Sequence, residues 1–578
     1  MKQIVFDIEA NGLKPDKVWV IVAHELDTQE TKVFSGDTLL DFNTYIKDFQ
    51  GDCEVIGHNI IDYDIPVLER VLGTCFGNSK VTDTLVLSRL GDPSREGGHS
   101  LEAWGQRLGC PKGEHSDWDN FSQDMVDYCV QDVLVNVKVY NALRGVISNF
   151  GSESISLEHR VQRIISKQIR NGWLLDQENA FVLLAKLKER KFDLEEAVHN
   201  TFKPLPTFIK QVKPKFKKDT SLSVVGLKFL GEQWATVGGE FSRIDYPEFN
   251  LGSRQQIGRY LQYFGWKPKQ FTEKGQAVVD ESVLSKVTGI PEASMIAEYL
   301  LVQKRIAQVQ SWLDAVDDED GRVHGYVNSN GAVTGRMTHS SPNMAQVPSV
   351  TAEYGADCRA CWIAPKGYKI VGMDASGLEL RMLAHYMNDE DYTNEILNGD
   401  IHTANQIASG VDTRSQAKTF IYAFLYGAGD AKIGTIVGGN AVDGRRLKEK
   451  FLANTPSLRD LRERVGMAAG RGYVYGMDGR RVAVRSEHSA LNTLLQSAGA
   501  IVMKKALCLL DEYATIWNID YKFVGNIHDE IQTEVREEEA EVFGGLAVSC
   551  IEAAGKHYNL NCPLTGEYKI GNNWSETH

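Results

Sequence analysis

The sequence has few cysteines, no surplus of positive charge and no long apolar run. Its nine cysteines are scattered, and the one close pair, Cys358 and Cys361, has no second pair at the spacing of a zinc site. We therefore expect buried thiols in a reducing compartment rather than disulfides or zinc. We expect no apolar run of membrane-spanning length, and the chain opens on a predicted strand, KQIVFDIEA, rather than on a signal or transit peptide. These absences favour a globular, cytoplasmic protein with no membrane partner.

The negative net charge excludes few classes of protein. A formal net charge of −14 at pH 7 excludes a basic coat over the whole surface. It does not exclude an enzyme that acts on nucleic acid, because such a protein needs only a local positive track, and metal sites need carboxylates. With 578 residues, of which 42% are hydrophobic, the chain is long enough for about three or four domains.

Two acids lie close together near the start of the chain. Residues 1–23 predict a strand, a turn at Asn11-Gly12 and a second strand over Val18–Val22. Asp7 and Glu9 are two residues apart, so on a strand they project from the same face. Carboxylates among apolar neighbours are costly to bury unless divalent cations neutralise them, which makes this pair a candidate metal site.

Two later segments extend this acidic set. HNIIDYDIP provides Asn59, Tyr63 and Asp64, and DYCVQDV provides Tyr128 and Asp132 at the i, i+4 spacing of a helix. With Asp7-x-Glu9, these segments resemble the three motifs of the DEDDy 3′–5′ exonucleases. The resemblance implies an RNase H-like domain that hydrolyses a terminal phosphodiester with two metal ions, in which Tyr128 orients the attacking water. The implied metal ligands are Asp7, Glu9, Asp64 and Asp132. By itself, DYCVQDV could also be a surface helix with one aromatic anchor.

A basic and aromatic stripe lies in DTRSQAKTFIYAFLYGAG. Arg414, Lys418, Tyr422 and Tyr426 recur at every fourth residue, so they share one face of a predicted helix. We expect Thr413 to cap its start and the glycines after the second tyrosine to end it. Cations followed by rings suit a nucleoside triphosphate, with phosphates on the charges and base and sugar against the rings. The alternative is a half-buried helix with a solvated basic end.

Two aspartates lie at predicted strand ends. Asp374 follows the predicted strand YKIVGM, and YKFVGNIHDEIQTEV predicts a tight hairpin with Asp529 and Glu530 at or near its turn. Two such carboxylates in one sheet could hold two Mg²⁺ ions roughly 3.5–4 Å apart, as two-metal phosphoryl transfer requires. Acids at a hairpin tip can also simply face water. Ser376 and Glu379 predict a capping box for the helix that follows.

Two further segments are candidates for contact with DNA. Lys203–Lys218 has prolines and no acid, and it predicts either a strand that touches duplex phosphates or a solvated loop. Gly331–Ser349 predicts a long loop, which in compact domains tends to be functional, although it could also be a linker. The candidate contacts in the two segments are Lys213, Lys215, Lys217, Arg336, Asn343 and Gln346.

Taken together, these motifs resemble one family. DASGLELR, RSQAKTFIYAFLYG and HDE resemble motifs A, B and C of the family A (Pol I-like) DNA polymerases, in their order along the chain. The TGR loop and LNTLLQSAGA fit the same family. Within it, EAWGQRLG, EILNGDIHT and the terminal NW…H resemble the bacteriophage T-seven type of replicative polymerase. The resemblance covers nearly the whole chain and is weak only across about 200–250.

The resemblance implies a role for each motif residue. Asp374 with Ala375, and Asp529 with Glu530 nearby, would hold two Mg²⁺ ions, for which Mn²⁺ can substitute; a second pair would serve the exonuclease. One ion lowers the pKa of the primer 3′ hydroxyl and the other escorts pyrophosphate. The incoming dNTP would meet His402, Arg414, Lys418, Tyr422, Tyr426 and Glu379. The minor groove, which reports pairing geometry, would meet Arg336, His488, Asn492 and Gln496.

Two of these identities imply a substrate preference. Glu379 would crowd the ribose 2′ position and so exclude ribonucleotides. Tyr422 stands where family members carry Tyr or Phe, and its hydroxyl would replace a missing sugar 3′ hydroxyl, which implies ready incorporation of dideoxynucleotides. Glu379 and the exonuclease motifs speak against a single-subunit RNA polymerase. The retained acids speak against a catalytically degenerate DNA-binding accessory protein.

The implied architecture is an α/β multi-domain protein, a DEDDy exonuclease domain joined to a right-hand polymerase. We expect the exonuclease at 1–148, thumb and connecting region at 149–348 with a short basic insert at about 201–249, and palm at 349–578 with fingers inserted at about 390–480. The implied partners are primer–template DNA, dNTPs, and a phage helicase–primase and single-strand binding protein. The T-seven type carries a long thumb insertion that recruits thioredoxin. The shorter region here leaves thioredoxin binding open.

Overall fold

The computed structural model describes residues 2–47 and 53–577, which form two compact units. One unit comprises residues 1–176 and 315–578, and the other comprises residues 177–314. The first unit contains both predicted groups of acids. The predicted boundaries at 148 and 348 remain predictions.

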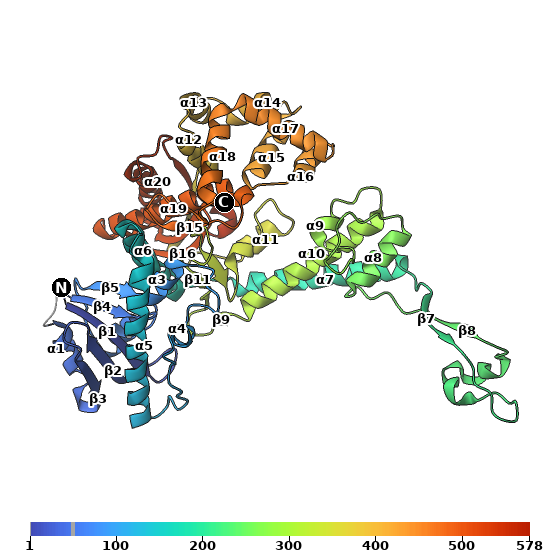
Figure 1. The fold of residues 1–578 in the computed structure, drawn as a ribbon, viewed down its shortest axis with the longest axis horizontal. Helices are drawn as coiled ribbons and strands as arrows, with labels where there is room; N and C mark the ends of the chain where they lie inside the picture. Colours follow the sequence, from blue (N-terminus) through green and yellow to red (C-terminus); the bar gives the residue numbers. More distant parts are fainter. Residues whose placement is uncertain (1, 48–52, 578) are drawn as a thin grey trace. The chain divides into compact units, whose positions relative to one another are not determined.

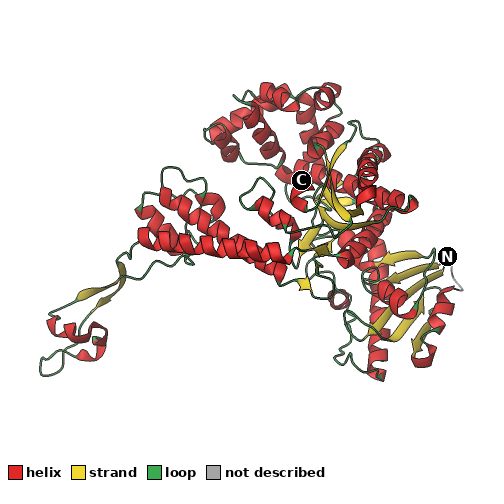
Figure 2. Ribbon diagram, turned by 180° about the vertical axis from the view of Figure 1, so that it is seen from behind, coloured by secondary structure: helices red, strands yellow, loops and turns green. Residues whose placement is uncertain are grey.

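The N-terminal part of the first unit is a five-stranded sheet with strand order β3-β2-β1-β4-β5. Strand β1 pairs antiparallel with β2 and parallel with β4, and apolar residues fill both of its faces. Figure 1 shows the long helix α5 running beside this sheet, and Figure 2 shows helices around the strands. The strands are β1 (Lys2–Ala10), β2 (Val18–Glu25), β3 (Thr31–Ser35), β4 (Cys53–Gly57) and β5 (Lys80–Asp83). The helices are α1 (Asp41–Lys47), α2 (Asp64–Leu72), α3 (Thr84–Gly91), α4 (Leu101–Arg107) and α5 (Gln123–Ile147).

The C-terminal part of the first unit is built on a four-stranded sheet with order β16-β17-β13-β18. It comprises β13 (Tyr368–Ala375), β16 (Tyr521–Ile527), β17 (Glu530–Arg536) and β18 (Gly566–Gly571). Helices α19 (Ala490–Ile516) and α20 (Ala540–His557) contribute to one continuous apolar core together with α6 (Ser152–Asn171). A buried ion pair, from Nζ of Lys504 to Oε1 of Glu158 at 2.7 Å, joins α19 to α6.

Seven helices follow β13 in sequence before a short hairpin. They are α12 (Leu378–Met387), α13 (Glu390–Asn398), α14 (Ile401–Ser409), α15 (Arg414–Leu425), α16 (Asp430–Ile436), α17 (Ala441–Asn454) and α18 (Pro456–Ala469). The hairpin pairs β14 (Tyr473–Tyr475) with β15 (Arg481–Ala483). Smaller pieces of the unit are β6 (Trp173–Leu174), β9 (Val316–Asp317), β10 (Arg322–Val323), β11 (Tyr326–Asn328), β12 (Thr338–Ser340) and α11 (Gly355–Ala360).

The second unit is a helical hairpin with a ribbon. Helices α7 (Gln177–Thr201) and α10 (Pro291–Leu313) pack along each other, with α8 (Arg254–Tyr263) and α9 (Glu281–Leu284) beside α10. Strands β7 (Thr207–Val212) and β8 (Phe241–Asp245) form an antiparallel ribbon. The basic segment was predicted to be extended, and β7 confirms this over part of its length.

Two local predictions are wrong. Helix α12 has no capping box, because its N-cap is Gly377 at φ 60°, without a side-chain cap, and the Glu379 carboxylate is bonded elsewhere. The segment Glu487–Ile516 is long and apolar enough to cross a membrane, contrary to our expectation. Its most apolar window is 83% buried inside the protein, so α19 is a core helix.

Candidate active sites

The predicted N-terminal acids converge on one cavity. Strand β1 carries Asp7 and Glu9, α2 begins at Asp64, and α5 carries Tyr128 and Asp132. All five side chains line a cavity of about 760 Å³, which we call the N-terminal cavity. The structure therefore brings residues of the three motifs to one cavity.

Burial sets the electrostatics of this cavity. It raises the pKa of Asp7 to about 7, with a further contribution from the charge of Asp132. Burial and then the charge of Asp7 raise the pKa of Glu9 to about 10. Burial and Asp7 also hold the pKa of Asp64 well above its ordinary value. Carboxylates so close together cannot all ionise unless cations join them.

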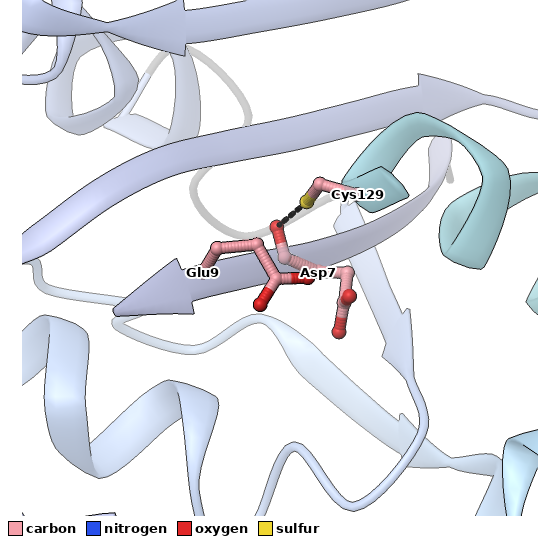
Figure 3. A group of neighbouring side chains, drawn as sticks. All are labelled: Asp7, Glu9 and Cys129. Carbon is pink, nitrogen blue, oxygen red and sulfur yellow. Dashed lines mark hydrogen bonds between the residues drawn. The ribbon is translucent and has the colours of Figure 1, made fainter. Parts of the chain in front are cut away.

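The donor set fits divalent metal ions. Oδ1 of Asp132 is buried and accepts no hydrogen bond from the described residues, so this ligand atom has lone pairs that no described donor uses. Carboxylate oxygens are the ligands that Mg²⁺ prefers. Figure 3 shows Asp7 and Glu9 on β1, with Cys129 above them in this view. The Cys129 thiol donates to the main-chain oxygen of Asp7 at 3.6 Å, and burial raises its pKa, so it packs as a thiol.

Sequence analysis missed one cation in this cavity. Nζ of Lys112 lies 2.6 Å from Oδ2 of Asp132 and 4.7 Å from the centre of the Tyr128 ring. Although burial opposes it, the charge of Asp132 raises the pKa of Lys112. Lys112 comes from the loop between α4 and α5, where no periodicity marks a single lysine. It therefore holds a motif carboxylate and the motif tyrosine together.

Asp374 and Asp529 lie at neighbouring positions of the C-terminal sheet, and we call them the sheet pair. Asp374 is the next-to-last residue of β13 and pairs in register with Glu530, the first residue of β17. The turn that joins β16 to β17 has two residues, His528 and Asp529, and His528 adopts φ 61°. The predicted hairpin, and the meeting of the two strand ends in one sheet, are confirmed. Asp374 is exposed and Asp529 half-buried.

Glu530 differs from its neighbours by pointing into the core. Its Oε1 accepts hydrogen bonds from Nε1 of Trp574 at 2.5 Å and from Nε2 of Gln532 at 2.6 Å. Nη1 of Arg359 lies 3.6 Å from the same oxygen. These contacts fix the hairpin from within. They leave the two aspartates as the solvent-facing acids of this group.

Helix α15 carries the predicted stripe. Thr413 caps it by accepting from the Gln416 amide at 3.1 Å, and the Gln416 side chain returns the bond, a reciprocal capping box. The opposite face of the helix, with Ala417, Phe420, Ile421 and Phe424, is buried. Burial, with the negative charges of Glu379 and Asp529, raises the pKa of Tyr422, so one member of the sheet pair acts electrostatically on this side chain.

The polar groups of Arg414 and Tyr426, at the two ends of the stripe, each bond to a carboxylate. Nε of Arg414 lies 2.6 Å from Oδ2 of Asp400, the residue that caps the helix carrying His402. The Tyr426 hydroxyl donates to both oxygens of Glu379, at 2.7 and 2.8 Å. Nη2 of Arg336 lies 3.5 Å from the same carboxylate. Arg336 and α15 are thereby linked through Glu379.

The remaining predicted contacts are spread over several elements. Asn492 and Gln496 are half-buried and lie one turn apart on α19, and His488 is exposed just before that helix. Asn343 caps a short 3₁₀ helix that includes Gln346, accepting from the Ala345 amide at 3.1 Å. The predicted lysines belong to the second unit, where Lys213 pairs with Glu240 at 3.2 Å and Lys215 and Lys217 are exposed. Their contact with DNA stays a prediction.

Comparison with known proteins identifies relatives along the whole chain. The family model for DNA polymerase family A matches residues 228–576. The DNA-directed DNA polymerases of Escherichia phage T7 and Enterobacteria phage T3 are each 36% identical over 707 aligned positions, which cover 100% of both chains. A solved structure, the POL domain of Pol1 from M. smegmatis in complex with DNA primer-template and dNTP, matches with a TM-score of 0.78 at 18% identity. The match covers 99% of this chain and 95% of that one.

Proposed function

This chain belongs to DNA polymerase family A, and we propose that it extends a primer by template-directed phosphoryl transfer and proofreads with a 3′–5′ exonuclease. The observation that carries the first activity is the sheet pair, whose Asp529 acts electrostatically on Tyr422 of the helix that carries the cations and rings. The observation that carries the second is the N-terminal cavity with its four carboxylates and one tyrosine.

For polymerisation, the protein side chains position the reactants. Asp374 and Asp529, with the main-chain oxygen of Ala375, would hold two Mg²⁺ ions, which supply charge neutralisation and an acidified primer 3′ hydroxyl when bound. Lys418 and Arg414 bind the triphosphate, with His402 beside them. Arg414 must exchange its bond to Asp400 for the phosphates, so nucleotide binding and helix position are coupled.

Glu379 is suited to sugar selection. Its carboxylate is fixed by Tyr426 and Arg336, so it cannot swing away from a bulkier ribose without losing charge-assisted hydrogen bonds. Tyr422 lies next to Tyr426 with ring centroids 6.5 Å apart, and presents its hydroxyl toward the acids. This arrangement favours deoxynucleotides, tolerates dideoxynucleotides, and speaks against an RNA polymerase.

For proofreading, the N-terminal cavity would hold a second pair of Mg²⁺ ions on Asp7, Glu9, Asp64 and Asp132. Tyr128 orients the water that attacks the terminal phosphodiester, and Lys112 keeps Tyr128 and Asp132 in place. The substrates are primer–template DNA and dNTPs in the host cytoplasm. A phage helicase–primase and single-strand binding protein are the proposed partners.

Primer extension tests the proposal directly. With a primed template, four dNTPs and Mg²⁺ or Mn²⁺, we expect templated extension, and chelation should abolish it. With single-stranded DNA and no dNTPs, we expect divalent-dependent release of mononucleotides from the 3′ end. Incorporation of ribonucleotides as fast as deoxynucleotides, or the absence of templated products, would contradict the polymerase assignment.

A further inference from the structure

A second cavity lies on the other side of the residues that line the N-terminal cavity. It has a volume of about 530 Å³ and is lined by residues of α2, β5 and α6, by Ile61 and the loop that joins α2 to β5, and by Asp511 of α19. No described residue lines both cavities. Residues 59–66 separate them, because Ile61, Ile65 and Pro66 face the second cavity while Asp62 and Asp64 face the first. The second cavity is therefore a separate site, which neither proposed activity uses.

One wall of this cavity is a row of cations on α6. Arg160, Arg163, Lys167 and Arg170 recur at three- and four-residue intervals, so they share one face of the helix. The opposite face of α6 is anchored in the core through Glu158, so this row cannot turn inward. The acids that line the cavity among the described residues are Glu69 and Asp511. Positive charge dominates the wall in a protein whose overall charge is negative.

Three of these cations make no ion pair within 4 Å in the described part of the chain. Arg160 pairs with Glu512 at 2.8 Å, whereas Arg163, Lys167 and Arg170 make no such pair, and the opposing charge that acts on Arg163 is that of Glu69. Burial lowers the pKa of the Arg163 guanidinium, so its charge is poorly solvated. Arg163 and Lys167 are one helical turn apart, close enough for a single phosphate group to contact both.

A buried hydroxyl on the same cavity also lacks a partner. Ser79 is only 8% exposed and lines the cavity, and its Oγ has no hydrogen-bond partner among the described residues. A buried hydroxyl is normally bonded, so a group inside the cavity is the expected partner. Beside the cationic wall, Ile65 and Pro66 form a half-buried apolar shelf. The cavity thus offers cations, a hydroxyl and an apolar surface together.

We propose that this cavity binds a nucleoside phosphate, either free or at the end of a DNA strand. The phosphate lies between Arg163 and Lys167, the sugar or base rests on Ile65 and Pro66, and the Ser79 hydroxyl bonds to the ligand. The volume lies within the range of small-molecule sites, which favours one nucleotide unit over a longer chain.

Cys75 provides a local test, because it is exposed and lines the same cavity. The alkylation rate of Cys75 is measured in the full chain by peptide mass spectrometry, with chelator present, against increasing deoxythymidine 5′-monophosphate. If only the ligand-free form reacts, the rate falls by the factor 1 + [L]/Kd, or roughly tenfold at ten times Kd. Nucleotide bound at the two active sites does not lie against this thiol. A 5′-phosphorylated oligonucleotide in a second arm distinguishes a strand end from the free nucleotide.

Variants separate the cavity from general electrostatics. Arg163→Glu with Lys167→Glu should abolish protection, and Ser79→Ala should weaken it severalfold. Lys138→Glu with Arg144→Glu, two exposed cations of α5, reverses the same number of charges and should leave protection unchanged. An unchanged Cys75 rate with both nucleotide and oligonucleotide would overturn the proposal. So would equal protection by inorganic phosphate at the same concentration, or stronger protection by an acidic peptide.

Discussion

The N-terminal cavity and the sheet pair hold acids in opposite surroundings. In the cavity, burial raises the pKa of the carboxyl groups, and one lysine is built in among them. In the sheet pair, Asp374 is exposed and Asp529 half-buried, and the cations predicted to bind the triphosphate lie on a separate helix. Buried carboxylates need a nearby cation to ionise at neutral pH, whereas exposed carboxylates ionise in water without one. The two sites are therefore expected to respond differently to mutation, pH and metal.

The largest expected effect is the separation of the two activities. Asp374→Ala should abolish primer extension while sparing degradation of single strands, and Asp7→Ala with Glu9→Ala should do the reverse. The loss of a carboxylate shared between metal ions costs about 5 kcal/mol, which is three to four decades in rate. Both rates are measured on each purified variant. Equal loss of both activities from either change would mean that the two sites are not independent.

The next effect concerns stability without metal. The pKa values of Asp7 and Glu9 are raised in the folded protein, to about 7 and about 10, so the folded state keeps protons that the unfolded chain has lost. The contribution of these two groups to the free energy of unfolding is complete below the ordinary carboxyl pKa. It is lost progressively as the pH rises toward their raised pKa values in the folded protein. Asp7→Asn with Glu9→Gln should remove this loss and stabilise the chelated protein by about 2 kcal/mol at pH 8.

The measurement is urea unfolding of the chelated protein at pH 5 and pH 8. The stabilisation by Asp7→Asn with Glu9→Gln should be small at pH 5. At that pH the folded and unfolded states of the native chain differ less in the protonation of Asp7 and Glu9. Asp374→Asn serves as the matched control, since that side chain is exposed. If the variant gained as much stability at pH 5 as at pH 8, burial would not be the cause of the raised pKa values of Asp7 and Glu9.

A smaller effect is expected on the polymerase side. Tyr422→Phe removes the hydroxyl that stands in for a missing sugar 3′ hydroxyl, so it should reduce dideoxynucleotide incorporation relative to dNTP incorporation by about ten- to thirtyfold. Single-nucleotide incorporation kinetics give this ratio, with the exonuclease inactivated. Degradation of single strands by the otherwise native enzyme should be unaffected. An unchanged ratio of dideoxynucleotide to dNTP incorporation would contradict the role given to Tyr422.

The smallest effect belongs to Lys112. Lys112→Met keeps the length of the side chain but removes the charge that holds Asp132 and Tyr128, so exonuclease kcat/KM should fall about fivefold, or about 1 kcal/mol. Lys138→Met on α5 is the matched control. Binding of Mn²⁺ to the cavity is a second readout, which a purely structural change elsewhere would not move. An unaltered exonuclease would mean that Lys112 only occupies the cavity.

The sequence predicts the parts of these sites that lie on regular elements. The Asp7–Glu9 pair on a strand, the hairpin that carries Asp529 and the cap at Thr413 follow from local periodicity and turn chemistry. Local rules fail where a distant contact decides. Glu379 matches a capping box in sequence, yet Tyr426, 47 residues away, takes its carboxylate.

Two other features lie beyond sequence patterns for the same reason. Lys112 is a single lysine in a loop, and only the packing of that loop against α5 brings it to Asp132. The α19 segment has the length and composition of a membrane span, and only its neighbours in the fold explain why so many of its apolar residues are buried. Local patterns therefore identify the ligands, whereas tertiary packing determines which groups accompany them.

The most direct measurement is anomalous diffraction from Mn²⁺ in crystals of the chain with primer–template and a non-hydrolysable incoming nucleotide. We expect two Mn²⁺ ions roughly 3.5–4 Å apart, both held by the carboxylates of Asp374 and Asp529 and lying next to α15. Two aspartates that lie far apart, or that share no ion in the ternary complex, would contradict it.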